Sequence, residues 1–330
     1  MASVAENDIR VDMGETTVVV TGVAGFIGHH TAALLLEWGC RVIGIDGFTE
    51  YYGRDLKERN LDVVRHHPRF TFVEAALDAE SCEAFASADA VIHLAAQPGV
   101  RDSWTEFETY VRQNLLVTKL VLDAALAHGV ERLVYASSSS VVGEAVAYPT
   151  HEDSPTEPRS PYGITKLAGE RLAVAYAHER GLPTVSLRYF TVFGPRQRPD
   201  MAIQRLIVSA LESRPFTMFG DGSQIRDFTY VGDVARANAL AALRPQVAAG
   251  SVFNVCGEEP ITLREVVDTV VEATGRPVTI ERLALPFGDV HRTGGSAAAI
   301  RATLGWSAQV PVREGIDLQV AAQVEGSAAA

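Results

Sequence analysis

The chain has few of the features that mark secreted, membrane-spanning or metal-binding proteins. Its 330 residues include three cysteines, Cys40, Cys82 and Cys256, which lie far apart without a CxxC pair, so neither a disulfide framework nor a zinc site is expected. No stretch reaches about 18 uninterrupted apolar residues, and the first residues lack the apolar segment of a signal peptide. We therefore predict a reduced, cytoplasmic protein that needs no metal and does not enter a membrane.

Positive charge is also scarce. The 29 Lys and Arg residues are outnumbered by 41 Asp and Glu residues, which gives a net charge of −12, and no segment is rich in Lys or Arg. Such a chain repels phosphate backbones at long range, so nucleic acid is not an expected partner, although a few local arginines can still bind a small anion. The composition, 47% hydrophobic and 21% charged, is that of a globular protein.

Short apolar runs alternate with helical patterns over the first part of the chain. The runs are bounded by turn residues and rich in β-branched residues, which is typical of strands buried on both faces of a parallel sheet. The expected strands are residues 16–22, 40–46, 69–75, 89–96, 132–139 and 184–190, the last of which closes the series. The expected helices are residues 26–39, a short acidic one from about residue 79, 114–128 and 162–180. This alternation predicts an α/β fold with a Rossmann-type, doubly wound parallel sheet.

A glycine-rich turn joins the first expected strand to the first helix. In TGVAGFIG, the glycines Gly22, Gly25 and Gly28 permit a tight turn, close approach of the backbone to a pyrophosphate, and close helix–strand packing. Asp46 ends the second strand 18 residues after Gly28, near the offset of about 20 expected for a carboxylate that binds ribose hydroxyls. A simple turn-forming role is the alternative for Asp46. The segment predicts a dinucleotide site, and NAD rather than NADP, because Asp46 would repel a 2′-phosphate.

The pattern changes near Gly194, where proline becomes more frequent and the helical and strand periodicities are interrupted. We assign residues 1–15 to an N-terminal extension and residues 16–193 to an NAD-binding Rossmann domain. Residues 194–330 are assigned mainly to a smaller C-terminal substrate-binding lobe, with return strands from this lobe to the sheet left open.

Tyr162 and Lys166 lie four residues apart at the start of an expected helix, and hence on one face of it. A run of serines, Ser137–Ser140, ends a strand at the sheet edge where ligands bind in such folds. Tyrosine, with a pKa of about 10, is a poor base at neutral pH, but a neighbouring ammonium and an oxidised nicotinamide both favour the phenolate. A YxxxK pair alone is usually a solvated helix face. Here the glycine-rich turn, the serine-bearing strand and the YxxxK pair follow one another along the chain, and this order predicts that a serine, Tyr162 and Lys166 form a catalytic set.

Together these motifs resemble the extended short-chain dehydrogenase/reductases, and among them the nucleotide-sugar epimerases and dehydratases. The matching segments, spread over roughly residues 16–295, are TGVAGFIG, HLAAQPGVRDS, YASSSSVVG, YGITK, RYFTVFGPRQRPDM and GDGSQIRDFTYVGDV. The resemblance implies NAD as cofactor, Ser138, Tyr162 and Lys166 as catalytic residues, and a homodimer paired through residues 114–128 and 162–180. The cofactor-binding residues that it implies are Gly22, Gly25, Phe26, Ile27, Gly28, Asp46, Leu77, Leu94, Ala95, Ala96, Asn114, Tyr162, Lys166 and Tyr189.

The two positions after Ser138 separate the members of this family. The 4,6-dehydratases carry Asp-Glu there, because elimination of the C6 hydroxyl needs an acid and a base, and the glucuronate decarboxylases carry Glu at the second position. Ser139 and Ser140 stand here instead, and a serine cannot act as a carboxylate base. The resemblance therefore implies an isomerase, a UDP-sugar 4-epimerase with tightly bound NAD. Such an enzyme forms a transient 4-keto sugar and returns the hydride to its opposite face.

Thr191 and Arg198 indicate the group at C6 of the sugar. Thr191 stands where galactose-type 4-epimerases usually carry Asn, and with Arg198 the segment resembles the UDP-glucuronate 4-epimerases. Hydroxyls and an arginine suit a carboxylate, so conversion of UDP-glucuronate to UDP-galacturonate is the expected reaction. Alternatives are a pyrophosphate or surface role for Arg198, epimerisation of UDP-glucose/galactose or UDP-N-acetylhexosamine, and, disfavoured by the serines, UDP-glucuronate decarboxylation. The expected substrate-binding residues are Gln97, Arg101, Ser138, Ser139, Ser140, Thr191, Arg198, Phe219, Arg226 and Arg292.

Four positions depart from the family pattern. Val142 replaces a common Tyr, and Gly295-Ser296 replaces a usual Ala-Asp pair. Ala76 replaces the Asp that usually contacts adenine, so that Asp78 or the backbone would take its place.

Overall fold

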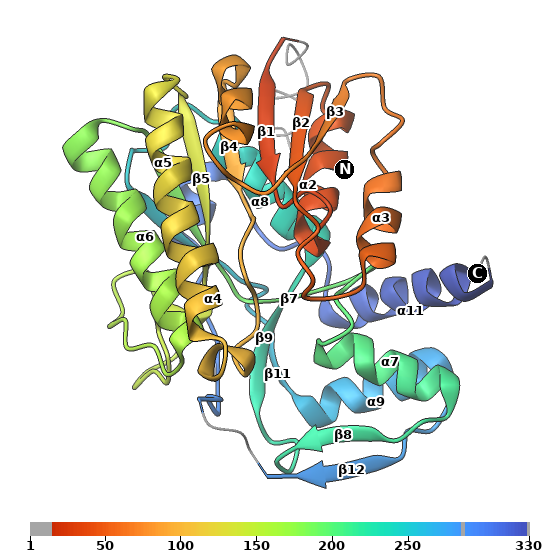
Figure 1. Ribbon diagram of the computed structural model, residues 1–330. Coiled ribbons are helices and arrows are strands. Elements are labelled where there is room, and N and C mark those ends of the chain that lie inside the picture. Colours follow the sequence, from red (N-terminus) through yellow and green to blue (C-terminus); the bar gives the residue numbers. More distant parts are fainter. Residues whose placement is uncertain (1–14, 285–287, 329–330) are drawn as a thin grey trace.

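A parallel β-sheet forms the centre of the computed structural model, which describes residues 15–284 and 288–328 (Figure 1). All six strand pairings in this sheet are parallel, and the strand order is β10-β6-β5-β4-β1-β2-β3. The strands are β1 (Thr17–Thr21), β2 (Arg41–Asp46), β3 (Phe70–Glu74), β4 (Ala90–His93), β5 (Arg132–Ser138), β6 (Thr184–Tyr189) and β10 (Ser251–Val255). This architecture confirms the predicted doubly wound fold.

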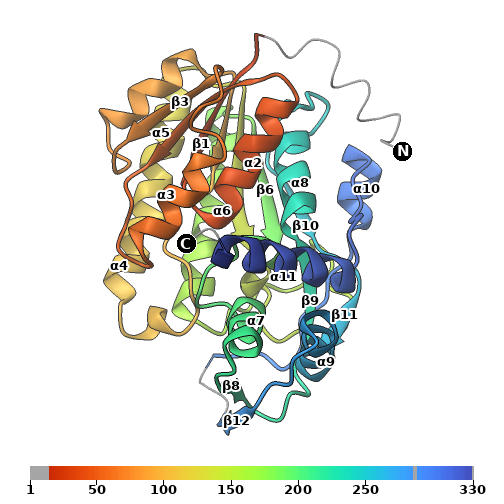
Figure 2. The same cartoon turned by 90° about the vertical axis from the view of Figure 1, so that its right-hand side faces the viewer.

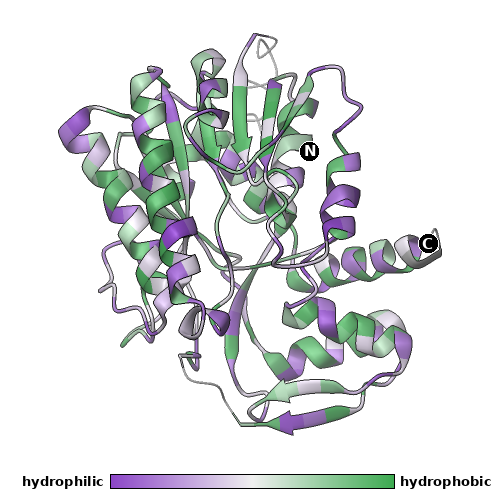
Figure 3. Cartoon of the chain, viewed as in Figure 1, coloured by the Kyte–Doolittle hydropathy of each residue, from purple (hydrophilic) through white to green (hydrophobic). Residues whose placement is uncertain are grey.

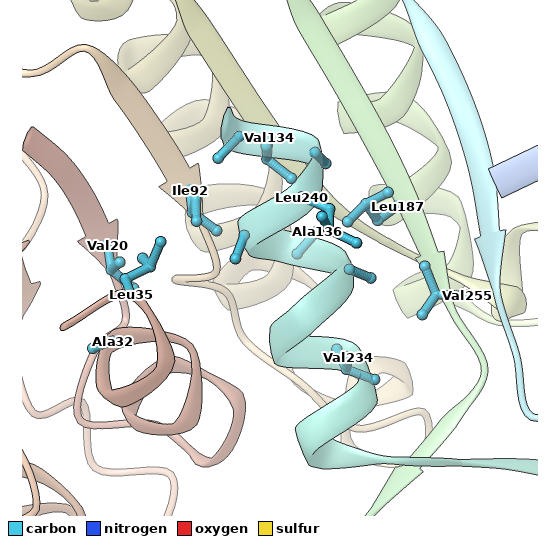
Figure 4. Close-up of a cluster of buried hydrophobic side chains, with 14 of the residues drawn as sticks. Val20, Ala32, Leu35, Ile92, Val134, Ala136, Leu187, Val234, Leu240 and Val255 are labelled. Carbon is cyan, nitrogen blue, oxygen red and sulfur yellow. The ribbon is translucent and has the colours of Figure 1, made fainter. Parts of the chain in front are cut away.

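Helices cover both faces of the sheet (Figures 1 and 2). One face carries α2 (Phe26–Glu37) and α8 (Val231–Leu243), which pack on each other and on the strands. The other face carries α5 (Val117–Ala127) and α6 (Pro161–Arg180). Figure 4 shows the apolar contact under α2 and α8, where Leu35 lies beside Val20 of β1 and Leu240 lies beside Ala136 and Leu187 of β5 and β6. Figure 3 shows that these central strands are largely apolar, as strands buried on both faces must be.

The six expected strands are present, but three helical features differ from the sequence-based expectation. The expected helix 114–128 begins earlier, as α4 (Phe107–Val111), and passes through a π-helical turn (Arg112–Leu116) into α5. The acidic helix expected from about residue 79 is a 3-10 helix, Ser81–Ser87. Helix α3 (Arg54–Asp62) was not predicted, because its mean hydropathy is low and it has no clear apolar stripe.

The expectation that residues 184–190 close the series of strands is wrong. After β6 the chain leaves the sheet, and then returns through α8 to β10, which pairs in parallel with β6 at the sheet edge. Segments from the predicted C-terminal lobe therefore complete the central sheet.

The remaining elements form a smaller unit at the carboxyl ends of the strands (Figure 2). Two small sheets and three helices surround an apolar core that includes Phe193, Leu206 and Val266. These elements are β7 (Thr191–Phe193), α7 (Ala202–Glu212), β8 (Phe216–Phe219), β9 (Ile225–Tyr230), β11 (Pro260–Thr262), α9 (Leu263–Thr274), β12 (Ile280–Leu283) and α11 (Val312–Ala328), with α10 (Ala298–Leu304) against β10. Among the described residues, no helix has both the length and the apolar character that a bilayer crossing requires. The predicted N-terminal extension, residues 1–15, lies outside the described residues except for residue 15.

Candidate active site

The turn between β1 and α2 brings backbone segments unusually close together. Gly22 has a φ of +70°, a conformation that favours glycine, and a Cβ on it would lie 2.8 Å from the Ala95 nitrogen. A Cβ on Gly28 would overlap the Gly22 carbonyl oxygen. Gly25 caps α2 without a side chain, so the N–H groups of the first helical turn remain available to an anion. The result is a backbone-lined concavity suited to a pyrophosphate.

Asp46 lies at the end of β2 beside this turn. Its Oδ2 accepts the Ala24 N–H at 3.0 Å, and its Oδ1 accepts the Phe48 N–H at 2.8 Å. Burial raises the pKa of the Asp46 carboxyl, and these two N–H groups and the charge of Lys57 oppose the rise. Asn60 holds the turn from behind by donating to the Ala24 carbonyl at 3.1 Å. The carboxylate is therefore fixed at the position expected for a ribose-binding group.

A first cleft runs from Asp46 along the strand ends to Tyr162. Of the expected cofactor residues, those that line it are Gly22, Gly25, Phe26, Ile27, Gly28, Asp46, Leu77, Leu94, Ala95, Ala96, Tyr162, Lys166 and Tyr189. Sequence reasoning missed several polar lining residues, namely Thr49, Tyr51, Tyr52, Lys57 and Gln113. The first four belong to α3 and the loop before it, and a helix predicted there would have signalled them.

Asn114 lies behind the first cleft, inside the π-helical turn, and is 1% exposed. Its Oδ1 accepts the Gln97 N–H at 2.7 Å, and its Nδ2 donates to the Gln97 carbonyl and to Thr165 Oγ1 at 3.0 and 3.1 Å. Asn114 thus joins the loop after β4 to the first turns of α6. Gln97, expected to bind substrate, lines the first cleft.

Tyr162 and Lys166 lie together in the lining of this cleft, and Ser138 is hydrogen-bonded to Tyr162. Ser138 ends β5, and its Oγ accepts the Ser140 N–H at 3.1 Å. Ser160 caps α6 by accepting the Gly163 N–H at 3.1 Å, which places Tyr162 in the first turn and Lys166 one turn later. The structure thus brings these three side chains close together, as the sequence analysis expected.

Burial dominates the acid–base properties of the pair. It raises the pKa of Tyr162, although a hydrogen bond with Ser138 and the charge of Arg198 oppose the rise. Burial also lowers the pKa of Lys166 to about 7, against the opposing charge of Glu170. The groups that oppose the rise of the Tyr162 pKa are thus Ser138 and Arg198 rather than Lys166, from which the sequence analysis expected the lowering.

A second cleft meets the first at Tyr162, which lines both. Of the expected substrate residues, those that line the second cleft are Arg101, Ser138, Ser139, Ser140, Thr191 and Arg198. Hydroxyl groups thus surround one side of Tyr162. The junction of the clefts allows one bound molecule in each to meet at the Tyr162 hydroxyl.

Arg198 lies at this junction with its guanidinium already paired. Its Nε and Nη2 donate to the two carboxylate oxygens of Asp200 at 3.0 and 2.9 Å, and its Cζ lies 5.8 Å from the centre of the Tyr51 ring. Those two bonds use the bidentate face that the sequence analysis assigned to a substrate carboxylate. Asp200 was not anticipated, although it follows Arg198 by only two residues.

Besides Gln97, which lines the first cleft, three expected substrate residues lie outside the lining of the second cleft. Phe219 is covered by the Arg101 guanidinium, whose Cζ is 3.9 Å from the ring centre. Arg226 donates to Asp289 Oδ1 at 2.6 Å, and Asp289 does line the second cleft. Arg292 lies over a tyrosine ring farther from Tyr162.

The departures from the family pattern have local explanations in two cases. A Cβ on Gly295 would come 2.5 Å from the Phe190 ring, so the glycine fits beneath that ring. Ala76 lines the first cleft, whereas Asp78 lies just before the 3-10 helix and its Oδ1 accepts the Ser81 N–H at 2.8 Å. Val142 is buried, and nothing in the structure explains its choice over tyrosine.

Comparison with known proteins agrees with this geometry. Residues 18–256 match the profile of the NAD dependent epimerase/dehydratase family. The chain belongs to this family. It is 38% identical to an uncharacterized UDP-glucose epimerase, YtcB, of Bacillus subtilis, over 92% of this chain and 96% of that one. It is 36% identical to a UDP-glucuronate 4-epimerase of Thermodesulfobacterium geofontis, over 90% and 93% of the two chains. The crystal structure of the UDP-glucuronic acid 4-epimerase of Bacillus cereus with UDP-glucuronic acid and NAD superposes with a TM-score of 0.91 at 36% identity. The match covers 94% of this chain and 99% of that one.

The residues of this family member fit an NAD cofactor. The cradle at Gly22 and Gly28 would be filled by any side chain, and the half-buried Asp46 carboxylate lies one strand away in the lining of the first cleft. A pyrophosphate suits the helix N-terminus, and an adenosine ribose suits Asp46. Tyr162 and Lys166 then lie at the nicotinamide end.

Proposed function

We propose that this protein is a UDP-sugar 4-epimerase that interconverts UDP-glucuronate and UDP-galacturonate. The observation that carries the proposal is the second cleft, which places Ser138–Ser140 and Thr191 beside Tyr162. Neutral donors of this kind suit the carboxylate at C6 of the sugar. The UDP-glucuronate 4-epimerase relatives support the same assignment.

The reaction requires a base at the C4 hydroxyl and a hydride acceptor at C4. NAD⁺, when bound, supplies the acceptor and gives the hydride back. Tyr162 takes the C4 hydroxyl proton and later returns it, and Ser138, hydrogen-bonded to Tyr162, holds the oxygen between them. Lys166 contributes a positive charge that favours the phenolate. Asp46 binds ribose hydroxyls at the far end of the first cleft.

The C6 carboxylate must be held while C4 is a ketone, because a β-keto acid loses carbon dioxide readily. We infer that the hydroxyls of Ser139, Ser140 and Thr191 hold it directly. Arg198 does not hold the carboxylate through its Nε and Nη2, because both already bind Asp200. Its role is to place a positive charge near the carboxylate. The absence of a carboxylate side chain at positions 139 and 140 also removes the base that a dehydratase needs.

The relative YtcB, described as a UDP-glucose epimerase, favours a second candidate substrate, UDP-glucose/galactose. To decide, purified protein is incubated with UDP-glucuronate, without added NAD, and the products are separated by chromatography and weighed. A product of unchanged mass that co-elutes with UDP-galacturonate supports the proposal. Loss of 44 mass units, the mass of carbon dioxide, indicates decarboxylation, and turnover of UDP-glucose alone indicates the second candidate.

We also propose that the protein works as a homodimer in the cytoplasm. Leu116 and Ile164, on the helices expected to pair, are 58% and 52% exposed, and Trp104 and Phe107 nearby are 53% and 47% exposed. Such a patch is typical of a surface that another protein covers. The three cysteines are free and buried, which suits a reducing compartment.

A further inference from the structure

A buried ion pair lies directly beneath the catalytic residues. Glu170 on α6 and Arg188 on β6 have side chains that are 0% and 2% exposed, and Arg188 Nε and Nη2 donate to the two Glu170 oxygens at 2.9 and 2.8 Å. Arg188 Nη1 donates to the Glu152 carbonyl at 3.0 Å. Replacing such a pair by apolar residues is often neutral or stabilising, because desolvation offsets the attraction. Stability alone therefore does not account for this pair.

Glu170 also holds the end of the strand that carries Ser138. The Ser137 hydroxyl donates to Glu170 Oε2 at 2.7 Å, within the protein interior. Successive side chains of a strand point to opposite faces, so fixing Ser137 on one face orients Ser138 on the other. Ser138 is the residue that is hydrogen-bonded to Tyr162.

Glu170 lies one helical turn after Lys166. Residues at positions i and i+4 of a helix share a face, with their Cβ atoms about 6 Å apart. Lys166 is 4% exposed, and burial lowers its pKa to about 7, while the Glu170 charge opposes this. Since the two side chains form no ion pair within the described part of the chain, the carboxylate acts on the ammonium through space.

The other groups around Lys166 carry no competing negative charge. His93 on β4 is buried and neutral, since burial and the charge of Lys166 lower its pKa to about 3. The Tyr135 ring lies 4.8 Å from Lys166 Nζ. Among the described residues, the titratable and charged groups that act on Lys166 or lie beside it are Glu170 of α6, Tyr135 of β5 and His93 of β4, and Tyr162 lines the first cleft with it.

We propose that Glu170 is a positioning residue for the catalytic set, serving as the counter-charge that keeps Lys166 protonated and as the anchor of the strand end that presents Ser138. The inference rests on the proposed function in taking Ser138, Tyr162 and Lys166 as the reacting groups. Removing the charge of Glu170 makes Lys166 lose its proton at lower pH. The Lys166 ammonium, which favours the Tyr162 phenolate, is then lost at a lower pH, so the alkaline limb of the pH–activity profile falls at a lower pH.

The chain offers an unusually direct test, because its only lysines are Lys57, Lys119 and Lys166. Protein labelled with ¹³C at the lysine ε-carbon gives three side-chain NMR signals, and K57R and K119R identify that of Lys166 by difference. In E170Q we expect the titration midpoint of Lys166 to fall by ~1 pH unit or more. E179Q, which removes an exposed carboxylate from the same helix, should leave the midpoint unchanged, and E170D, which keeps the charge, should restore it.

An E170Q midpoint equal to that of the unaltered protein would overturn the proposal. If E170Q does not fold, the double variant E170M/R188M removes both buried charges together, and a smaller fall in the Lys166 midpoint is expected, because the loss of the Arg188 cation partly offsets the loss of the Glu170 anion. Activity measured in parallel should lose its alkaline limb at lower pH in E170Q, whereas a purely structural role would lower activity equally at every pH. The NMR titration uses no substrate, so a wrong choice of sugar leaves its result unaffected.

Discussion

Tyr162 lines both clefts, and its ring packs edge-on against Tyr110 at 6.3 Å between centres. Removal of the hydroxyl should leave the ring contact intact. In Y162F we expect turnover to fall by about 10²–10⁴-fold, the range for loss of a general base, with bound NAD retained. The measurement is kcat with UDP-glucuronate, together with the NAD content of the denatured protein.

Tyr176 provides the matched control, since it lies on the same helix and its hydroxyl bonds to Asp123 away from both clefts. Y176F should keep turnover within about twofold. If Y162F retained most of its activity, another group would have to remove the proton, and the assignment of Tyr162 as the base would fail.

The residue scale also shows where sequence reasoning stopped. Glycines and Asp46 were predicted because turns and helix N-termini impose local rules that can be read in order along the chain. The pairing of Arg198 with Asp200 was not, although both residues lie in one motif, because spacing does not reveal which partner a guanidinium chooses. Glu170 was missed for the same reason, since Arg188 reaches it only once β6 is placed beside α6.

Among the elements, α6 has the most direct effect on the chemistry, because its first turn carries Tyr162 and its second carries Lys166. Ser160 fixes where that helix begins. Substitution S160A should lower the free energy of unfolding by about 1 kcal/mol. It should also lower kcat by several-fold, since the first turn is then free to fray; urea unfolding and steady-state kinetics measure the two effects.

A helix far from the clefts separates the two consequences. Thr262 caps α9 in a full capping box. Its Oγ1 accepts the Glu265 N–H at 3.1 Å, and its own N–H donates to the Glu265 carboxylate at 2.7 Å. T262A should cost about 1 kcal/mol of stability and leave kcat unchanged. Equal losses of kcat in T262A and S160A would contradict the prediction that the start of α6 positions the residues needed for turnover.

Element prediction succeeded where burial was uniform and failed where it was not. The central strands are apolar on both faces, so short apolar runs located all of those before residue 190. The sequences of the polar helix α3 and the return strand β10 do not stand out from the flanking sequence in this way. Their places follow from contacts with distant segments, which a single sequence does not display.

At the scale of the whole molecule, buried histidines couple folding to pH. Burial lowers the pKa of His30 from 6.5 to about 4, with its bond to the Pro195 carbonyl opposing and the charge of Arg196 adding to the fall. Between pH 4 and 6.5 the unfolded chain binds more protons than the folded one, so stability rises with pH across that window and is fully present above it. We expect the free energy of unfolding to fall on acidification from pH 6.5, and H30Q to reduce that slope. H66Q, at an exposed position, should not.

The homodimer proposal is also tested on the intact molecule. Light scattering should give twice the chain mass of 35.5 kDa, and I164E, which places a charge in the exposed apolar patch, should give a single chain mass. A single chain mass for the unaltered protein contradicts the proposal. The exposed Val146, outside the two helices, supplies a control in V146E, which should remain paired.

The return of the chain through α8 to β10 has a consequence for synthesis. While a ribosome is still making the protein, the sheet face beneath α8 stays uncovered until residue 243 has emerged, and β6 presents an unpaired edge until residue 255 has emerged. Nascent chains with open edges and exposed apolar faces attract chaperones and one another. Cotranslational folding of the nucleotide-binding half therefore cannot finish early, and a fragment ending at residue 193 should aggregate rather than fold as a free-standing unit.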